Sequence, residues 1–118
     1  MDKEFYRRHA QMCGAFAHPL RLELLQLLHD RGECTVGDLA EATGVRMANL
    51  SQHLAVMRST NMVLSRKEGV SVYYRLADPR IMKAFDLITE VMLSQMAREE
   101  EWRREFAEHL QEPASEVE

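Results

Sequence analysis

The segment Gly44 to Asn61 combines residue types that suit a helix with one face packed and the other offered to a polar ligand. Its apolar residues recur at steps of three and four, as on one side of a helix: Met47, Leu50, Leu54 and Met57. The opposite side is polar but almost uncharged. Amide side chains can bond an adenine edge through two hydrogen bonds, and small side chains let a helix approach the floor of the DNA major groove. The residues that we predict to contact base edges are Ala48, Asn49, Ser51 and Gln52.

The residues before this segment predict a second helix that would position it. Thr35 has the spacing of a helix cap, with the acidic Asp38 three residues later, and Gly44 ends the short apolar pattern that follows. Asn61 occupies the place where a left-handed residue commonly closes a helix. Two helices separated by a tight glycine turn form a helix-turn-helix, which we assign to residues 35–61.

After Asn61 the pattern changes to period two, over Met62–Lys67 and again over Ser71–Leu76, with Glu68-Gly69-Val70 between the two runs. This pattern predicts a β-hairpin with basic residues near its tip. A hairpin directly after a recognition helix is the wing of a winged helix, so residues 62–76 complete the predicted DNA-binding unit.

Charge is distributed unevenly along the chain. The net charge is −4, yet residues 44–75 contain five Arg or Lys residues against one glutamate, whereas residues 98–118 contain three arginines against eight glutamates. A basic reading surface and an acidic far end are typical of a small DNA-binding protein. The residues that we expect to make positioning contacts with the DNA backbone are Arg46, His53, Arg58, Arg66 and Lys67.

Outside this unit the sequence predicts helices. Residues 2–16 form a first helix, and Pro19 opens a second helix. A capping aspartate followed by a first-turn proline begins a last helix over residues 79–111, and residues 113–118 remain as an acidic tail. The fold class is therefore mainly α with a small β-hairpin, in a single domain over residues 1–112 of the 118-residue chain.

The last helix carries an apolar stripe that is too long for so small a domain to cover. The stripe consists of Ile81, Phe85, Ile88, Met92 and Met96, and resumes at Trp102, Phe106 and Leu110. A second copy of the chain is the simplest cover. We therefore predict a homodimer in which the helices of residues 2–16 and 79–111 form the interface.

The run from Ala17 to Leu76 resembles the ArsR/SmtB family of small dimeric winged-helix repressors. The matching pieces are HPLRLELL, TVGDLAEATG, LSQHLAVMR and the hairpin that ends in VYYRL, in the family's order and spacing. The resemblance implies that the first and last helices form the dimer and that two recognition helices lie about one DNA turn apart on a pseudo-palindromic operator of double-stranded DNA. The chain departs from the family pattern at Arg46 and Met47, where the recognition helix commonly begins with Ser-Gln, and at Asn61, which replaces a usual glycine.

The family's known effector sites are not reproduced in this chain. Members that sense soft metals carry Cys-Val-Cys where this chain has Thr35 and Gly37. Zinc sensors of the family use Asp and His on the last helix, and here no His occurs between Asp78 and Glu108.

Two cysteines are left, Cys13 and Cys34, and His9 lies one helical turn before Cys13. A thiolate site built from them would suit a soft metal or metalloid effector, and the sequence indicates no other cofactor. The alternative is that Cys13 packs at the dimer interface as a small apolar residue and Cys34 closes a loop.

Other function classes find little support. The sequence contains no Ser, His and Asp set, glycine-rich phosphate loop or His-Glu-x-x-His pattern that would indicate an enzyme. It has no signal-like N-terminus and no apolar run of membrane length, so we expect a cytoplasmic protein without membrane contact. The residues favour a DNA-binding repressor that a metal, metalloid, redox or other small signal releases. A winged-helix protein-interaction module without DNA binding is the alternative.

Overall fold

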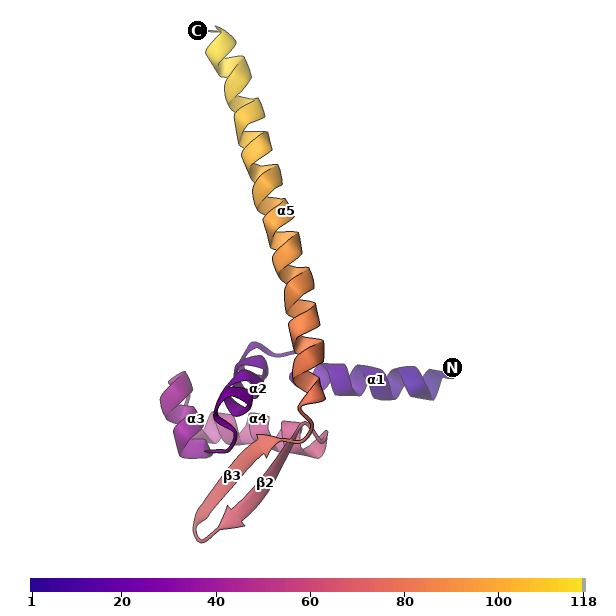
Figure 1. Cartoon of the computed structure of the whole chain (residues 1–118), viewed down its shortest axis with the longest axis vertical. Coiled ribbons are helices and arrows are strands. Elements are labelled where there is room, and N and C mark those ends of the chain that lie inside the picture. The colour runs from indigo at the N-terminus through magenta and orange to yellow at the C-terminus, as the bar shows by residue number, and fades with distance from the viewer. Residues whose placement is uncertain (118) are drawn as a thin grey trace. The chain divides into compact units, whose positions relative to one another are not determined.

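The computed structural model describes the backbone of residues 1–117 and the side chains of residues 1–109. In chain order the elements are α1 (Lys3–Phe16), α2 (Pro19–Arg31), β1 (Cys34–Thr35), α3 (Val36–Thr43), α4 (Met47–Ser59), β2 (Val63–Glu68), β3 (Ser71–Leu76) and α5 (Arg80–Val117) (Figure 1). The chain divides into two units, residues 1–82 and the part of α5 from Lys83 onward. The predicted domain of residues 1–112 spans both units.

Helices α1 and α2 begin where the sequence predicts, each behind a side-chain cap. Asp2 Oδ1 accepts a hydrogen bond from the Phe5 backbone N–H at 3.0 Å, at the start of α1. His18 Nδ1 accepts from the Leu20 backbone N–H at 3.1 Å, at the start of α2. Pro19 occupies the first turn of α2, where a backbone N–H would have no partner within the helix.

The helix-turn-helix is built as the capping pattern predicts. Thr35 Oγ1 accepts from the Asp38 backbone N–H at 3.1 Å, and Asp38 Oδ2 accepts from the Thr35 N–H at 3.0 Å, which forms a reciprocal capping box at the start of α3. Gly44 closes α3 with a φ of 72°, and Asn61 follows α4 with a φ of 61°. The predicted helix end at Gly44 and the predicted left-handed residue at Asn61 are both confirmed.

The two strands of the wing, β2 and β3, belong to a three-stranded antiparallel sheet in the order β1-β3-β2. The predicted hairpin is present, and Gly69 makes its turn with a φ of 61°. The sequence did not predict β1, which pairs Cys34 with Tyr74 and Thr35 with Tyr73. A strand of two residues is too short to show an alternating pattern, so only its neighbour β3 could reveal it.

The core of the first unit lies between α2, the inner face of α4 and the start of β2. Its fully buried side chains are Leu24, Leu25, Leu28, Cys34, Leu39, Leu50, Leu54, Met57, Met62 and Val63. The predicted apolar stripe of α4 is therefore confirmed at three of its four positions. It is wrong at Met47, which is 54% exposed, because the first residue of α4 lies beyond the elements that cover the following turns.

Helix α5 begins behind a cap, as predicted. Asp78 Oδ1 accepts from the Arg80 backbone N–H at 3.0 Å, and the helix then extends to Val117, beyond the predicted end at residue 111. The acidic tail predicted over residues 113–118, like Leu110 of the apolar stripe, lies outside the residues whose side chains are described.

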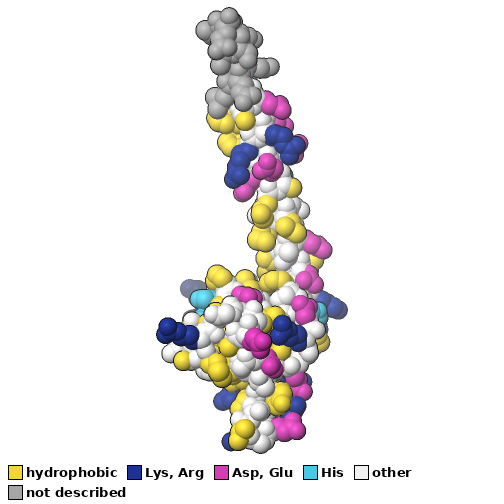
Figure 2. All heavy atoms as spheres, turned by 90° about the vertical axis from the view of Figure 1, so that its left-hand side faces the viewer, with side chains coloured by type: hydrophobic (Ala, Val, Ile, Leu, Met, Phe, Trp, Pro, Cys, Tyr) yellow, Lys and Arg dark blue, Asp and Glu magenta, His cyan; other side chains and the backbone are white. Residues whose placement is uncertain are grey.

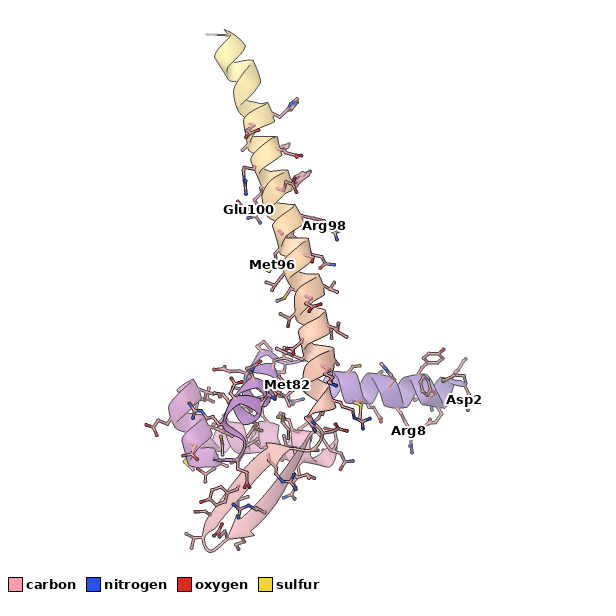
Figure 3. All side chains as sticks on the ribbon, in the orientation of Figure 1. Asp2, Arg8, Met82, Met96, Arg98 and Glu100 are labelled. Atoms are coloured by element: carbon pink, nitrogen blue, oxygen red, sulfur yellow. The ribbon has the colours of Figure 1, made fainter. Side chains whose placement is uncertain are left out.

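Much of the apolar stripe of α5 is exposed. Ile81 and Phe85 are half-buried. The exposed apolar side chains of α5 are Leu87, Ile88, Val91, Met92, Leu93, Met96, Trp102 and Phe106, and Figure 2 shows hydrophobic side chains at the helix surface. Met96 and the charged Arg98 project from opposite sides of the helix (Figure 3). None of the described helices is both long and apolar enough to cross a membrane.

The different surroundings of Met47 and Leu50 lead to a stability prediction. Leu50→Ala should lower the free energy of unfolding by about 2–5 kcal/mol, because it leaves a cavity in a fully buried site. Met47→Ala, three residues earlier on the same helix, should lower it by roughly 1 kcal/mol or less. Urea unfolding followed by circular dichroism measures both, and equal losses would mean that Met47 belongs to the core.

Candidate nucleic-acid interface

The outer face of α4 presents small and amide side chains to solvent. All four residues that we predicted to contact base edges are exposed: Ala48, Asn49, Ser51 and Gln52. The intervening Leu50 is completely buried. Because a helix turns by about 100° per residue, burial of Leu50 and Leu54 directs the amide side chains away from the core. The structure therefore brings the predicted base-contacting residues together on one accessible surface.

Met47 belongs to this exposed surface, although its spacing in the sequence predicted a buried position. It lines an open groove of about 340 Å³ together with residues of the wing, among them Val70 and Val72. Its position as the first residue of α4, directly after Arg46, was the feature of the sequence that could have indicated exposure. The opening residue of a helix is often beyond the reach of the core that covers later turns.

The two arginines at the ends of α4 differ in the hydrogen bonds that their side chains make. Arg46 precedes the helix with extended backbone, and its side chain makes no capping hydrogen bond. Arg58, in the last turn, donates from Nη1 to Ser65 Oγ at 3.3 Å, which links α4 to β2. Both are exposed at opposite ends of the helix, where a DNA backbone on either side of a groove could meet them.

Arg66 of the wing is held by two carboxylates within its own chain. Its Nε and Nη2 donate to the two carboxylate oxygens of Glu33 at 2.7 and 3.2 Å, and its Nη1 donates to Glu68 Oε2 at 2.6 Å. The guanidinium also lies 4.5 Å from the centroid of the Tyr73 ring, its partner across the sheet. We call Arg66, Glu33, Glu68 and Tyr73 the Arg66 cluster. The hydrogen bonds from Arg66 hold the pKa of Glu33 below its usual range, so that the carboxylate stays charged.

The Arg66 cluster changes the charge that the wing can offer to DNA. The positive charge of Arg66 faces two negative charges, so the cluster has no net positive charge. The neighbouring Lys67 is exposed and makes no ion pair with any side chain that the structure describes. Of the two basic residues of β2 that were predicted to contact the DNA backbone, Arg66 is paired with carboxylates and Lys67 is not.

His53 lies in surroundings that differ from those expected of a phosphate contact. Its ring is half-buried, and Nδ1 accepts a hydrogen bond from Arg21 Nε of α2 at 3.1 Å. The ring centroid of His18 lies 4.5 Å away. Burial, followed by the nearby His18 and Arg21, lowers the pKa of His53, which favours the uncharged ring. An uncharged ring bonded inside its own chain is poorly suited to positioning DNA.

Comparison with known proteins identifies the relatives of this fold. A model of a helix-turn-helix domain family matches residues 16–66. The HTH-type transcriptional regulator Rv0081 of Mycobacterium tuberculosis is 33% identical over 94 residues, which cover 78% of this chain and 82% of the relative. The transcriptional repressor SmtB homolog of Synechocystis is 36% identical over 112 residues, or 95% of this chain and 70% of the relative. This chain belongs to the ArsR/SmtB family.

Solved structures agree with the sequence relatives. The crystal structure of Rv0081 from M. tuberculosis superposes on this regulator with a TM-score of 0.73 at 30% identity, over 81% of this chain and 96% of the other. The homodimeric winged helix-turn-helix DNA-binding domain Mb0332 from Mycobacterium bovis gives 0.70 at 31% identity, over 79% and 85% of the two chains. The predicted winged-helix fold class is confirmed, and the regulator is a DNA-binding transcription factor.

The two cysteines of the regulator lie in different surroundings. Cys34 is 1% exposed within β1, and its burial raises the pKa of the thiol above its ordinary value. Cys34 therefore belongs to the core. The alternative interpretation, in which Cys34 closes a loop, is wrong. Cys13 is exposed on α1, with its Sγ 3.6 Å from His9 Nδ1. Among the described residues, no group of three or more His, Cys, Asp or Glu side chains could hold a metal ion.

This difference predicts unequal thiol reactivity. In the folded regulator Cys13 should react with a disulfide reagent at least about tenfold faster than Cys34, because a buried thiol with a raised pKa forms little accessible thiolate. The rates are measured by absorbance on the wild type, with Cys13→Ser and Cys34→Ser to assign each phase. Equal rates in the native chain would contradict the burial of Cys34.

Proposed function

We propose that this regulator is a homodimeric repressor that binds a pseudo-palindromic operator in the cytoplasm. Ala48, Asn49, Ser51 and Gln52 contact base edges in the major groove. Arg46, Arg58 and Lys67 contact phosphates and fix the register of α4 on the duplex. Arg66 supports the wing through the Arg66 cluster and adds a phosphate contact only where phosphate displaces a carboxylate. His53 is left out of the contact set.

The observation that carries this proposal is the composition of the outer face of α4. The helix exposes Asn49 and Gln52 beside small residues, while its inner face is fully buried. A merely solvated helix face more often carries Glu and Lys, and this stretch has neither. The same observation disfavours the alternative of a protein-interaction module, because such a module has no need of an uncharged amide face framed by arginines. It gives no support to an enzymatic role either.

The dimer is supported by the exposed apolar side chains of α5. Ile88, Met92 and Met96 repeat at steps of four and are all exposed. Trp102 and Phe106 stack on each other with ring centroids 5.3 Å apart and an angle of 9° between the rings, and they too are exposed. Mb0332, a neighbour in structure, is homodimeric. A second α5 would remove these side chains from water.

The structure offers little support for an effector site that uses both cysteines. A site at Cys34 would require β1 to leave the core, since the thiol is almost fully covered. His9 and Cys13 are adjacent and accessible, but they supply only two ligands per chain. A soft metal or metalloid bound there would need further ligands, which a second copy could supply. We therefore propose His9 and Cys13, without Cys34, as the remaining candidates for a soft-metal effector.

Base contact and phosphate contact by neighbouring elements predict different mutational effects. Gln52→Ala should weaken operator binding by about 1–3 kcal/mol and leave binding to random DNA nearly unchanged. Lys67→Ala should weaken both DNAs similarly and reduce the salt dependence by roughly one charge. Fluorescence anisotropy with both DNAs across a salt series measures these effects. Equal losses on both DNAs for Gln52→Ala would show that Gln52 does not contact bases.

The aromatic pair predicts a contribution of the distal part of α5 to the dimer. The double variant Trp102→Ala and Phe106→Ala should dissociate at concentrations where the parent is dimeric, because it loses two large apolar contacts. Arg103→Ala with Glu105→Ala is the matched control, since it changes the same turns without changing net charge. Sedimentation equilibrium decides the matter, and a dimer as tight as the parent would show that the pair lies outside the interface.

A further inference from the structure

A polar network connects the recognition helix to the end of the first helix. Arg21 of α2 donates from Nε to His53 Nδ1 at 3.1 Å and from Nη1 to the Ala15 backbone oxygen at 3.0 Å. Ala15 is the buried residue near the end of α1, and Arg21 and His53 are half-buried. One guanidinium therefore bridges α1, α2 and α4.

The two histidines of this network both use Nδ1 as an acceptor. His18 Nδ1 accepts from the Leu20 backbone N–H and caps α2, while His53 Nδ1 accepts from Arg21. A histidine nitrogen can accept only when it carries no proton, so both rings must be neutral with the proton on Nε2. The rings lie 4.5 Å apart between centroids at an angle of 52°. Protonation of either ring on Nδ1 removes a hydrogen bond that this arrangement uses.

We propose that His53 is a positioning residue whose neutral ring, held by Arg21 and His18, fixes α4 against α2, so that acidification releases the regulator from its operator. The proposal rests on the function proposed above. It assigns His53 the opposite role from the phosphate contact that the sequence suggested. A cationic His53 would attract phosphate, whereas here the cationic form disrupts the surface that reads DNA.

The charges around His53 explain the direction of the effect. Helix α4 packs against α1, α2, α3 and β2. The groups that act on His53 are His18 and Arg21, both positive or able to become positive. Several charged groups of the other elements pair among themselves: Glu4 with Arg7 and Arg8 on α1, Asp38 with Thr35 at the start of α3, and Arg66 of β2 with Glu33 and Glu68. Lys3 of α1, Glu41 of α3 and Lys67 of β2 are exposed and are not among the groups that act on His53. Within the described residues, no carboxylate is among the groups that would stabilise a cationic His53.

Protonation would therefore place a positive charge beside Arg21 and His18 in a partly desolvated position. Burial, His18 and Arg21 all lower the pKa of His53, so the folded arrangement is favoured above the ordinary value near 6.5. The arrangement is lost as the pH falls through the lowered pKa. The apparent operator affinity is proportional to the fraction of chains in which α4 keeps its position against α2, so it decreases as this fraction decreases.

The first test uses the full chain without DNA. Nuclear magnetic resonance of histidine labelled with ¹⁵N reports the tautomer and the titration of each ring. We expect His53 in the neutral Nε2–H form at pH 7.5, with a midpoint below the ordinary histidine value. A proton on Nδ1, or a midpoint at or above the ordinary value, would overturn the proposal even if the regulator never bound DNA.

The second test measures operator binding at constant ionic strength near pH 7.5 and pH 5.5, with circular dichroism to verify that the chain is folded at both. The wild type should bind roughly tenfold more weakly at the lower pH. In His53→Asn, Oδ1 can replace Nδ1 as the acceptor for Arg21 but cannot titrate, so the ratio between the two pH values should be clearly smaller than in the wild type. His29→Asn, which changes an exposed histidine of α2, should keep the wild-type ratio.

The outcomes separate this proposal from the function on which it rests. Equal ratios in the wild type and His53→Asn would overturn the positioning role. Tighter wild-type binding in acid that disappears in His53→Asn would also overturn it and would restore the phosphate contact. A chain without sequence-specific binding at either pH would contradict the proposed repressor, and the nuclear magnetic resonance titration would still decide whether the network holds a neutral His53.

Discussion

The structure of the first unit depends on the burial of one face of α4. Leu50, Leu54 and Met57 are completely removed from solvent, against a core that α2 and the start of β2 complete. Helical geometry then fixes which side chains lie on the opposite face, because the direction of one side of a helix determines the direction of every other side chain. The orientation of the surface that we propose to contact DNA is thus set by apolar packing on the opposite side of the helix. A substitution that loosens the packing of Leu50, Leu54 or Met57 would therefore also shift the exposed side chains on the other face of α4.

Electrostatics in this regulator is organised by local pairing more than by total charge. The sequence places five basic residues in the DNA-binding unit, yet Arg66 is neutralised by Glu33 and Glu68 and stacks on Tyr73. Such a paired arginine braces the wing against the loop that precedes β1 and gives a weaker long-range attraction for phosphate than an unpaired one. Lys67 is exposed on the same strand and is not among the residues that form ion pairs in the described part of the chain, so we propose that it contributes more to the attraction of DNA.

Signals could reach the recognition helix through polar contacts as well as through packing. Arg21 bonds the backbone of the buried Ala15, near the end of α1, and the ring of His53 at once. The accessible His9 and Cys13 lie on α1, the same helix that ends at Ala15. A regulator needs two arrangements that differ in affinity for DNA, and the protonation of His53 proposed above would separate two such arrangements.

The sequence by itself determined most of the local structure, because caps, glycine turns and apolar periodicity act over a few residues. The Thr35 box, Gly44, Asn61 and the hairpin turn were all readable in this way, and so was the amide face of α4. Tertiary structure decided what depends on residues distant in sequence. It added β1, whose two residues pair only with β3, and it exposed Met47, buried Cys34 and joined Arg21 to His53 across 32 positions. Periodicity gives the side of a helix on which a residue lies, whereas its partners follow only from the packing of the other elements.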